Sequence, residues 1–260
     1  MPVDLTQYLL GALSGSLVGL TLGLFGGGGS ILAVPLMVYL VGVADAHVAI
    51  GTSAVAVAAN AAVNLATHAR RGNVRWRCAL IYSAAGVAGA FLGTLAGKAL
   101  EGGKLLFLFS LLMLVVGGLM IFTRNRTEDV AAKCTAQNAP KTLGYGAGTG
   151  ALAGFFGIGG GFLIVPGLIA STGMPLLGAI GSSLVAVTAF GLTTALSYAA
   201  SGLVDWSLAA VFVAGGALGG IVGAFAAGQI ARRRGALNMS FAALIVGVAL
   251  YMAVRSGAAI

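Results

Sequence analysis

Long apolar segments separated by short polar loops make up most of the chain, and each segment predicts a helix in a membrane. Crossing the hydrocarbon core takes about 20 mainly apolar residues. The pattern predicts full-length spans at 47–69, 78–98, 105–122, 177–200, 207–230 and 237–254. Residues 5–25 predict a further apolar helix, whereas 30–43, 143–156 and 162–172 are too short to cross. We therefore expect an all-α polytopic integral membrane protein.

Two glycine-rich interruptions break this apolar pattern. The first is Gly26-Gly27-Gly28-Gly29-Ser30, and the second is Gly157-Ile158-Gly159-Gly160-Gly161. Each glycine costs about 1 kcal/mol relative to alanine in a helix, so four in a row are expected to end helical structure. Irregular backbone at membrane depth persists only inside protein or beside a watery cavity. The interruptions predict two broken hairpins, 5–43 and 143–172, with a binding site at the breaks.

The order of elements repeats at an offset near 130 residues. Gly51-Thr52-Ser53 corresponds to Gly181-Ser182-Ser183, and the loop Gly72-x-Val74-x-Trp76 corresponds to Gly202-x-Val204-x-Trp206. The chain therefore divides into a first repeat, 1–122, a polar linker, 123–142, and a second repeat, 143–260. We expect one broken hairpin and three spanning helices in each repeat.

The distribution of Lys and Arg favours an inverted arrangement of the two repeats. Cytoplasmic loops of membrane proteins carry an excess of these residues. If each broken segment turns back, eleven Lys and Arg residues lie inside and three outside; if each crosses once, the repeats are parallel and the division is nine to five. The inverted arrangement puts the linker 123–142 in the cytoplasm and both termini outside.

The amino-acid composition agrees with a membrane protein and argues against a nucleic-acid-binding protein. The chain is 59% hydrophobic and 8% charged, whereas soluble domains carry about 25% charged residues. Its net charge of +8 comes from basic clusters in short loops, which orient a protein in a lipid bilayer and do not indicate nucleic-acid binding. The start of the chain lacks the basic region of a cleavable signal peptide. Cys78 and Cys134 are expected to be unlinked thiols.

The glycine breaks also have the chemistry of an anion site. Each precedes a short helix, whose first-turn N–H groups lack intrahelical partners and carry about half a positive charge. We predict that Gly26 to Ser30, together with Gly157, Gly159, Gly160 and Gly161, bind a small anion. Pro35 and Pro166 are predicted to be structural hinges of the short helices. The alternative is that the glycines only permit tight helix packing.

Polar residues follow one face of segment 47–69. Ser53, Asn60, Asn64 and His68 are spaced by 7, 4 and 4 residues, so they share a face. Polar groups inside a membrane are usually functional, although interhelical hydrogen bonding is the alternative. Histidine titrates near neutral pH, which makes His68 a candidate for proton coupling. The candidate substrate-binding residues outside the breaks are Thr52, Ser53, Asn60, Asn64, Ser182 and Ser183.

Several other classes of protein are disfavoured. No predicted span has a central Asp, Glu, Lys or Arg, which argues against a cation pump with a carboxylate relay. The sequence has no Walker-type loop and no cluster with metal-ligand spacing, so we expect no metal and no cofactor. Ser53 and His68 could form a hydrolytic pair only if they were close, and 15 residues of helix separate them by about 22 Å. We predict no catalytic residue.

Three features together resemble the TauE/SafE family of sulfite exporters, also called the 4-toluene sulfonate uptake permease family. They are the breaks followed by Pro35 and Pro166, the Gly-[Thr/Ser]-Ser elements, and the Gly-x-Val-x-Trp loops. The resemblance covers nearly the whole chain. It implies secondary transport of sulfite, a sulfonate or a related small anion across a bacterial inner membrane, by alternating movement of two halves. An anion channel, or a transporter of another organic anion, is the alternative, and the sequence leaves the oligomeric state open.

Overall fold

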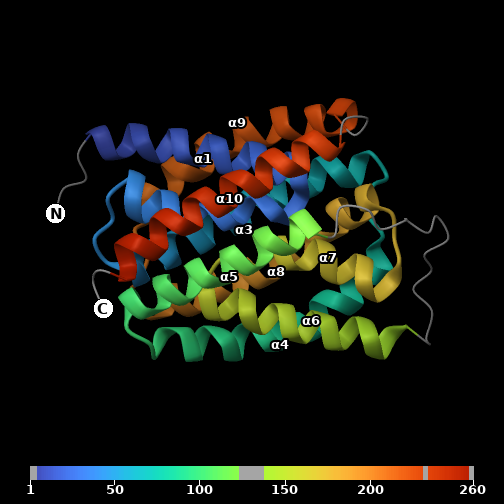
Figure 1. Ribbon diagram of the computed structural model, residues 1–260, viewed down its shortest axis with the longest axis horizontal. Coiled ribbons are helices and arrows are strands. Elements are labelled where there is room, and N and C mark those ends of the chain that lie inside the picture. Colours follow the sequence, from blue (N-terminus) through green and yellow to red (C-terminus); the bar gives the residue numbers. More distant parts are fainter. Residues whose placement is uncertain (1–4, 123–137, 231–233, 258–260) are drawn as a thin grey trace.

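The computed structural model describes residues 5–122, 138–230 and 234–257, and within these ranges all regular structure is helical (Figure 1). Five of the described helices are long and apolar enough to cross a membrane, namely α1, α3, α4, α8 and α9. The predicted all-α polytopic class is therefore confirmed. Most of the predicted linker, residues 123–137, lies outside the described residues. The α-helices are α1 (Leu5–Phe25), α2 (Ala33–Pro35), α3 (Ala46–Arg70), α4 (Trp76–Lys98), α5 (Gly102–Phe122), α6 (Ala139–Phe156), α7 (Gly161–Thr172), α8 (Leu176–Ala200), α9 (Trp206–Ile230) and α10 (Arg234–Gly257).

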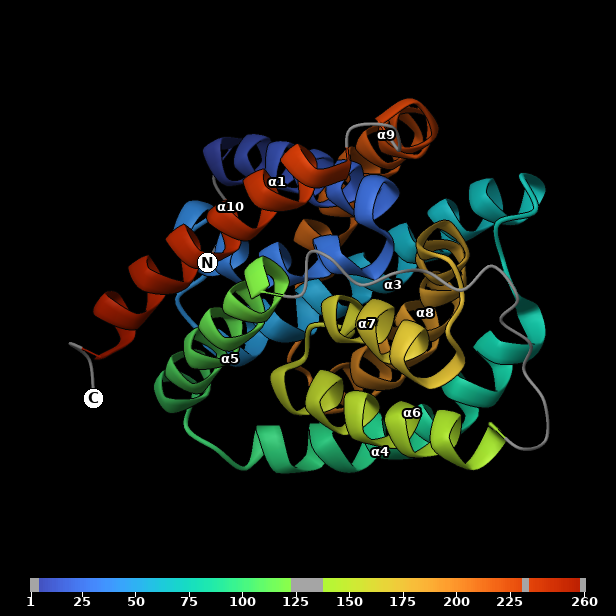
Figure 2. The same cartoon turned by 45° about the vertical axis from the view of Figure 1, so that its right-hand side comes forward.

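The long helices lie side by side along one axis, and pairs of helices from distant parts of the chain build the bundle. α1 packs on α9 along one edge, and α4 packs on α6 along the opposite edge (Figures 1 and 2). α3 packs on α8 in the centre, and α5 pairs with α10. In Figure 1, α1 begins and α10 ends at the left, whereas α5 ends and α6 begins at the right.

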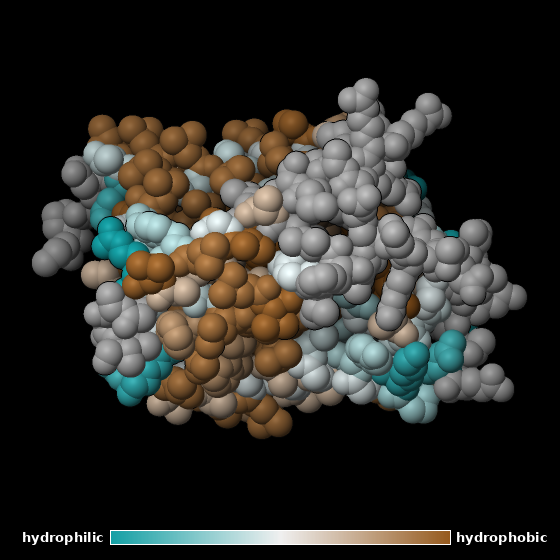
Figure 3. Space-filling model, viewed as in Figure 1, coloured by the Kyte–Doolittle hydropathy of each residue, from teal (hydrophilic) through white to brown (hydrophobic). Residues whose placement is uncertain are grey.

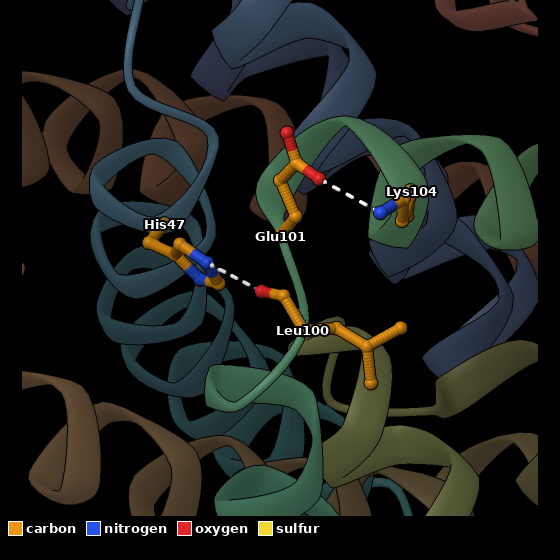
Figure 4. A network of polar contacts seen from close by, with 4 residues as sticks. All are labelled: His47, Leu100, Glu101 and Lys104. Carbon is orange, nitrogen blue, oxygen red and sulfur yellow. Dashed lines mark hydrogen bonds and ion pairs between the residues drawn. The ribbon is translucent and has the colours of Figure 1, made fainter. Parts of the chain in front are cut away.

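The two ends of the bundle are polar, and the surface between them is apolar. Figure 3 shows hydrophobic residues across the middle of one face and hydrophilic residues towards both ends. At the end where α3 begins, the His47 ring donates to the Leu100 carbonyl at 3.0 Å, and Lys104 pairs with Glu101 at 3.0 Å (Figure 4). We call this the His47 end. At the opposite end, here called the Arg71 end, the Arg71 guanidinium donates to the Ala224 carbonyl and lies 4.4 Å from the centre of the Phe225 ring.

Glycines allow the paired helices to approach until backbone meets backbone. A Cβ added to Gly19 on α1 would overlap the Gly216 carbonyl on α9. A Cβ added to Gly93 on α4 would overlap the Ala151 carbonyl on α6. Small residues drive association of membrane helices in this way, because lipid offers no hydrophobic driving force between them.

The first glycine stretch differs from the open break that the sequence predicts. Residues Gly26–Leu32 form a 3₁₀-helix, and a π-helical turn at Leu36–Leu40 follows α2. The α-helix does end at Phe25, but a tighter helix with i→i+3 bonds continues through the four glycines. The expectation that they end all helical structure is therefore wrong. The second stretch is irregular as predicted, with positive φ at Gly157, Gly159 and Gly160.

The cysteine expectation is also wrong for Cys78, the third residue of α4. Its side chain is buried, and its sulfur forms a disulfide bond. Cys134 lies outside the described residues. Spacing along the sequence could not reveal this bond, because it depends on how the chain folds.

Candidate functional site

The two glycine stretches meet in the interior of the bundle. Gly27 in the 3₁₀-helix and Gly161 at the start of α7 are both buried. A Cβ added to Gly161 would overlap the Gly27 carbonyl, and one added to Gly27 would overlap the Gly161 Cα atom. Any side chain at either position would therefore push the segments apart. The structure thus brings together two of the predicted site segments, which are more than 100 residues apart in sequence.

In the first stretch, a serine from α8 accepts a hydrogen bond from a backbone amide. The Gly27 N–H donates to Ser183 Oγ at 3.1 Å, and Ser183 Oγ donates to the Ile180 carbonyl at 2.8 Å. Ser30 Oγ donates to the Gly27 carbonyl at 2.9 Å. These groups are buried and satisfy one another, so this stretch is closed within the protein.

In the second stretch, four consecutive amides that lead into α7 have no partner among the described residues, whereas the next two do. The N–H groups of Leu163 and Ile164 both donate to the Gly160 carbonyl, at 3.0 and 3.2 Å. Along the described chain, the amides from Gly159 to Phe162 form no hydrogen bond, although these residues are buried. Such amides at a helix N-terminus carry a positive partial charge.

Ser53 lies on the face of α3 that meets this second stretch. Ile50 contacts the Cβ position of Gly157, and Val57 Cγ1 lies 3.2 Å from that of Gly159. Ser53 sits between Ile50 and Val57 at helical spacing, so it shares their face. Its side chain is fully buried, and its Oγ has no hydrogen-bond partner among the described residues.

Thr52 and Ser182 hold loops in this structure. The Asp205 N–H donates to Thr52 Oγ1 at 3.0 Å, and the Arg75 N–H donates to Ser182 Oγ at 2.9 Å. Each hydroxyl thus holds a loop from the other half of the chain. The binding role predicted for both residues stays a prediction, because their hydroxyls are already engaged here.

Asn60 lies about 10 Å further along α3 than Ser53, and Asn64 about 16 Å; both face α9. A Cβ added to Gly216 would overlap the Asn60 amide, and one added to Gly220 would lie 2.5 Å from Asn64 Nδ2. Asn64 Nδ2 donates to the Asn60 carbonyl at 2.9 Å. Asn64 Oδ1 and both amide atoms of Asn60 are buried without a partner among the described residues. We call the contact of Asn60 with Gly216 the asparagine notch; the glycine spacing on α9 could have indicated it from the sequence.

The other half builds the same contact from different side chains. Gly86 on α4 lies against the buried ring of Phe190 on α8. Nearby, Thr194 Oγ1 lies 3.2 Å from Thr94 Oγ1, which donates to the Ala90 carbonyl at 2.7 Å. This contact, the phenylalanine notch, is filled and its polar neighbours have partners.

The candidates for proton coupling and for hinges lie away from the contact between Gly27 and Gly161, which we call the glycine crossing. The His68 ring donates from Nε2 to the Gly23 carbonyl at 3.3 Å, near the Arg71 end. Pro35 closes α2 before the π-helical turn, and Pro166 lies inside α7. Hinge and proton-coupling roles remain predictions.

Two further observations concern ligands. Within the described ranges, no group of three or more His, Cys, Asp and Glu side chains could hold a metal ion. A groove of about 250 Å³ between α3 and α8 is lined almost entirely by aliphatic side chains, including Val55, Leu192 and Leu196. This apolar lining suits a lipid tail better than an anion.

The comparisons with known proteins point to membrane transport. The family model described as sulfite exporter TauE/SafE matches residues 11–252. A probable membrane transporter protein of Xylella fastidiosa (strain 9a5c) is 50% identical over 253 residues, which is 95% of each chain. The probable membrane transporter protein YunE of Bacillus subtilis is 27% identical, over 83% of this chain and 84% of its own. A probable membrane transporter protein of Haemophilus influenzae is 29% identical, over 76% of this chain and 75% of its own. No solved structure matches.

Proposed function

The chain belongs to the TauE/SafE family of sulfite exporters and is a membrane transporter, and on this premise we propose that it carries a small sulfur-containing anion by secondary transport. The cargo would be sulfite, a sulfonate or a related organosulfur anion. The observation that carries the proposal is the crossing of Gly27 with Gly161, beside buried amides at the start of α7 that have no partner within the described ranges. Backbone N–H groups at a helix start can bind an anion in the membrane without a formal positive charge.

The helix pairing supports two inverted repeats, 1–122 and 143–260, around this crossing. If α1 matches α6, α3 matches α8, α4 matches α9 and α5 matches α10, the α1–α9 pair exchanges into the α6–α4 pair. The α3–α8 and α5–α10 pairs exchange into themselves. Any two-fold axis has this effect. An axis in the membrane plane, which is common in secondary transporters, also makes α3 and α8 antiparallel. This agrees with α3 beginning at the His47 end, whereas Ser182 near the start of α8 accepts from the Arg75 N–H at the Arg71 end.

In this mechanism the crossing is the gate. The two backbones touch at Gly27 and Gly161, so a cargo would pass this point only when the two hairpins separate, from one side and then from the other. Pro35 and Pro166 would be the hinges of that movement, and His68 a candidate for proton coupling. The proposed binding residues are Gly26, Gly27, Gly28, Gly29, Ser30, Thr52, Ser53, Asn60, Asn64, Gly157, Gly159, Gly160, Gly161, Ser182 and Ser183.

We propose a bacterial inner membrane, with the Arg71 end and the linker 123–142 in the cytoplasm. The Lys and Arg excess of the loops supports this orientation. The disulfide of Cys78 weighs against it, because Cys78 lies near the Arg71 end and disulfides are rare in reducing compartments. Labelling single cysteines placed at residues 128 and 257 from each side of sealed vesicles distinguishes the two orientations. Accessibility of residue 257 from the cytoplasmic side would contradict the proposal.

Counterflow in proteoliposomes tests the transport mode. Vesicles loaded with unlabelled sulfite should accelerate uptake of labelled sulfite, and uptake should saturate. An anion channel would show neither trans-stimulation nor saturation. The same assay, run with thiosulfate, sulfonates and carboxylates, identifies the cargo or replaces it with another organic anion.

Leucine substitution tests the site. Gly28→Leu or Gly160→Leu should abolish flux, because each position adjoins a glycine of the Gly27–Gly161 crossing and a branched side chain there blocks closure of the hairpins. Membrane insertion, measured by fractionation and by elution as a single species in detergent, should remain. Wild-type flux in both variants would remove the glycine stretches from the pathway.

A further inference from the structure

We propose that the anion binds on one side of the crossing only, between the Ser53 hydroxyl and the free amides at the start of α7. This inference rests on the proposed function and deepens it. It assigns binding to the second glycine stretch and to α3. The first stretch, whose polar groups bond one another, then only encloses the site and does not bind the anion. Inverted repeats would otherwise predict two equal half-sites.

The equivalent serines of the two repeats provide the first step of the argument. Ser183 shows what a serine at this position does when an amide of the facing stretch is within reach, since it accepts from Gly27 at 3.1 Å. Ser53 faces the other stretch from the same position and accepts from none. The 3₁₀ geometry of the first stretch brings Gly27 to Ser183, whereas the Ile158 N–H turns back to the Ala153 carbonyl at 3.2 Å.

The second step is that donors remain unused both in the second stretch and on the face of α3 whose Ile50 and Val57 pack against that stretch. The Ser53 hydroxyl is fully buried and has no partner in the part of the chain that the structure describes. The amides from Gly159 to Phe162 are buried as well, and the structure assigns them none. Buried polar groups without a partner cost free energy, and native proteins pair nearly all of them. A bound oxyanion accepts from the hydroxyl and from several amides at once, so one guest satisfies the whole group.

The third step concerns the charge of the guest. The donors named here are all neutral, and the partial charge at a helix start is about half a unit. A neutral site compensates one negative charge far better than two, because the desolvation penalty rises steeply with charge. We therefore assign the site to a singly charged oxyanion, such as a sulfonate head group or hydrogen sulfite, and not to dianionic sulfate.

Binding to the purified full-length protein tests this assignment. By titration calorimetry, methanesulfonate should bind saturably and more tightly than sulfate. Ser53→Ala should weaken methanesulfonate binding roughly 10- to 100-fold, because it removes one hydrogen bond to a charged group. Ser14 on α1 also has a buried hydroxyl without a partner among the described residues, but it lies 11 residues before the end of its helix. Ser14→Ala is therefore the matched control and should change affinity less than twofold.

A carboxylate at position 53 provides a readout that a structural role would not produce. In Ser53→Asp the side chain should occupy the place of the anion and accept from the α7 amides. Methanesulfonate binding should disappear while the melting temperature stays equal to that of the wild type or rises. A melting temperature lowered by several degrees would overturn the inference, since it would mean that no donors receive the charge.

The outcomes separate this inference from the proposed function. If the wild type transports or binds a sulfur anion but Ser53→Ala behaves like Ser14→Ala, the one-sided site is wrong and transport stands. If sulfate binds more tightly than methanesulfonate, the charge assignment is wrong. If the wild type binds neither anion but still transports sulfite by counterflow, the site is overturned and the function is not.

Discussion

The asparagine notch and the phenylalanine notch are the same helix contact built twice, with opposite fillings. In each, a glycine of one helix receives a side chain from the central pair, Asn60 against Gly216 and Phe190 against Gly86. The phenylalanine fills its notch with a ring and needs no partner. The asparagine has a partner for neither of its amide atoms among residues 5–122, 138–230 and 234–257. The two contacts thus share a glycine against a central helix and differ in the chemistry of the side chain that meets it.

If the proposed pathway follows α3, this difference separates a contact that serves stability from one that serves polar solutes. An unpartnered buried polar group costs about 1–3 kcal/mol, so Asn60 is a poor choice for packing alone. Buried polar groups of this kind commonly hold water. The asparagine notch, with Asn64 one turn beyond, therefore suits a hydrated route between the glycine crossing and the Arg71 end, and the phenylalanine notch suits a fixed strut.

The largest expected effect is on the phenylalanine notch. Phe190→Ala should lower the free energy of unfolding by about 3–5 kcal/mol, because it empties a fully buried site against a glycine. Thermal unfolding in detergent measures this loss. Leu196→Ala on the same helix removes an exposed side chain and is the control. Equal losses in the two variants would contradict the role of Phe190 as a strut.

A smaller and opposite effect is expected in the asparagine notch. Asn60→Leu keeps the volume and removes both unpartnered atoms, so stability should hold or rise by about 1–3 kcal/mol. Flux should nevertheless fall at least tenfold. Thr194→Val, at the matching face of α8, should leave flux within twofold. Unchanged flux in Asn60→Leu would mean that the asparagine notch serves only helix packing and has no role in transport.

The smallest effect is expected where the two halves are alike. Thr52→Val and Ser182→Ala each leave a loop amide without its acceptor, and each should cost about 1 kcal/mol. Hydrogen exchange at Asp205 and Arg75 should accelerate in the respective variant. A difference above about 1 kcal/mol between the variants would mean that the halves also differ at these loops.

Four of the predicted full-length spans, 47–69, 78–98, 177–200 and 207–230, match helices long enough to cross a membrane, because span length depends on local composition. The predicted spans 105–122 and 237–254 are not among the five candidate spans of the described residues, whereas Leu5–Phe25 is. The predicted span 47–69 and the observed Ala46–Arg70 differ by one residue at each end. The 3₁₀ course of Gly26–Leu32 could not be predicted in the same way, since helix propensity ignores the packing of Gly29 against Thr21 and Leu22.

Ser53 and Ser183 show the same limit within the candidate site. They are equivalent in sequence, and only the folded chain shows that one is paired and the other is not. The loop contacts of Thr52 and Ser182 were missed for a related reason. Each joins residues more than 100 positions apart, and no local pattern carries that information.

Those crossed loop contacts have a consequence for biosynthesis. Thr52 is synthesised about 150 residues before Asp205, whose N–H it accepts from. Arg75 is likewise synthesised before Ser182, the acceptor of its N–H. In a nascent chain that stops after α5, the Thr52 hydroxyl and the Arg75 N–H therefore lack these partners, one at each end of the bundle. We expect the first half made alone to be held by the insertion machinery or degraded, and to be rescued when the second half is supplied as a separate polypeptide.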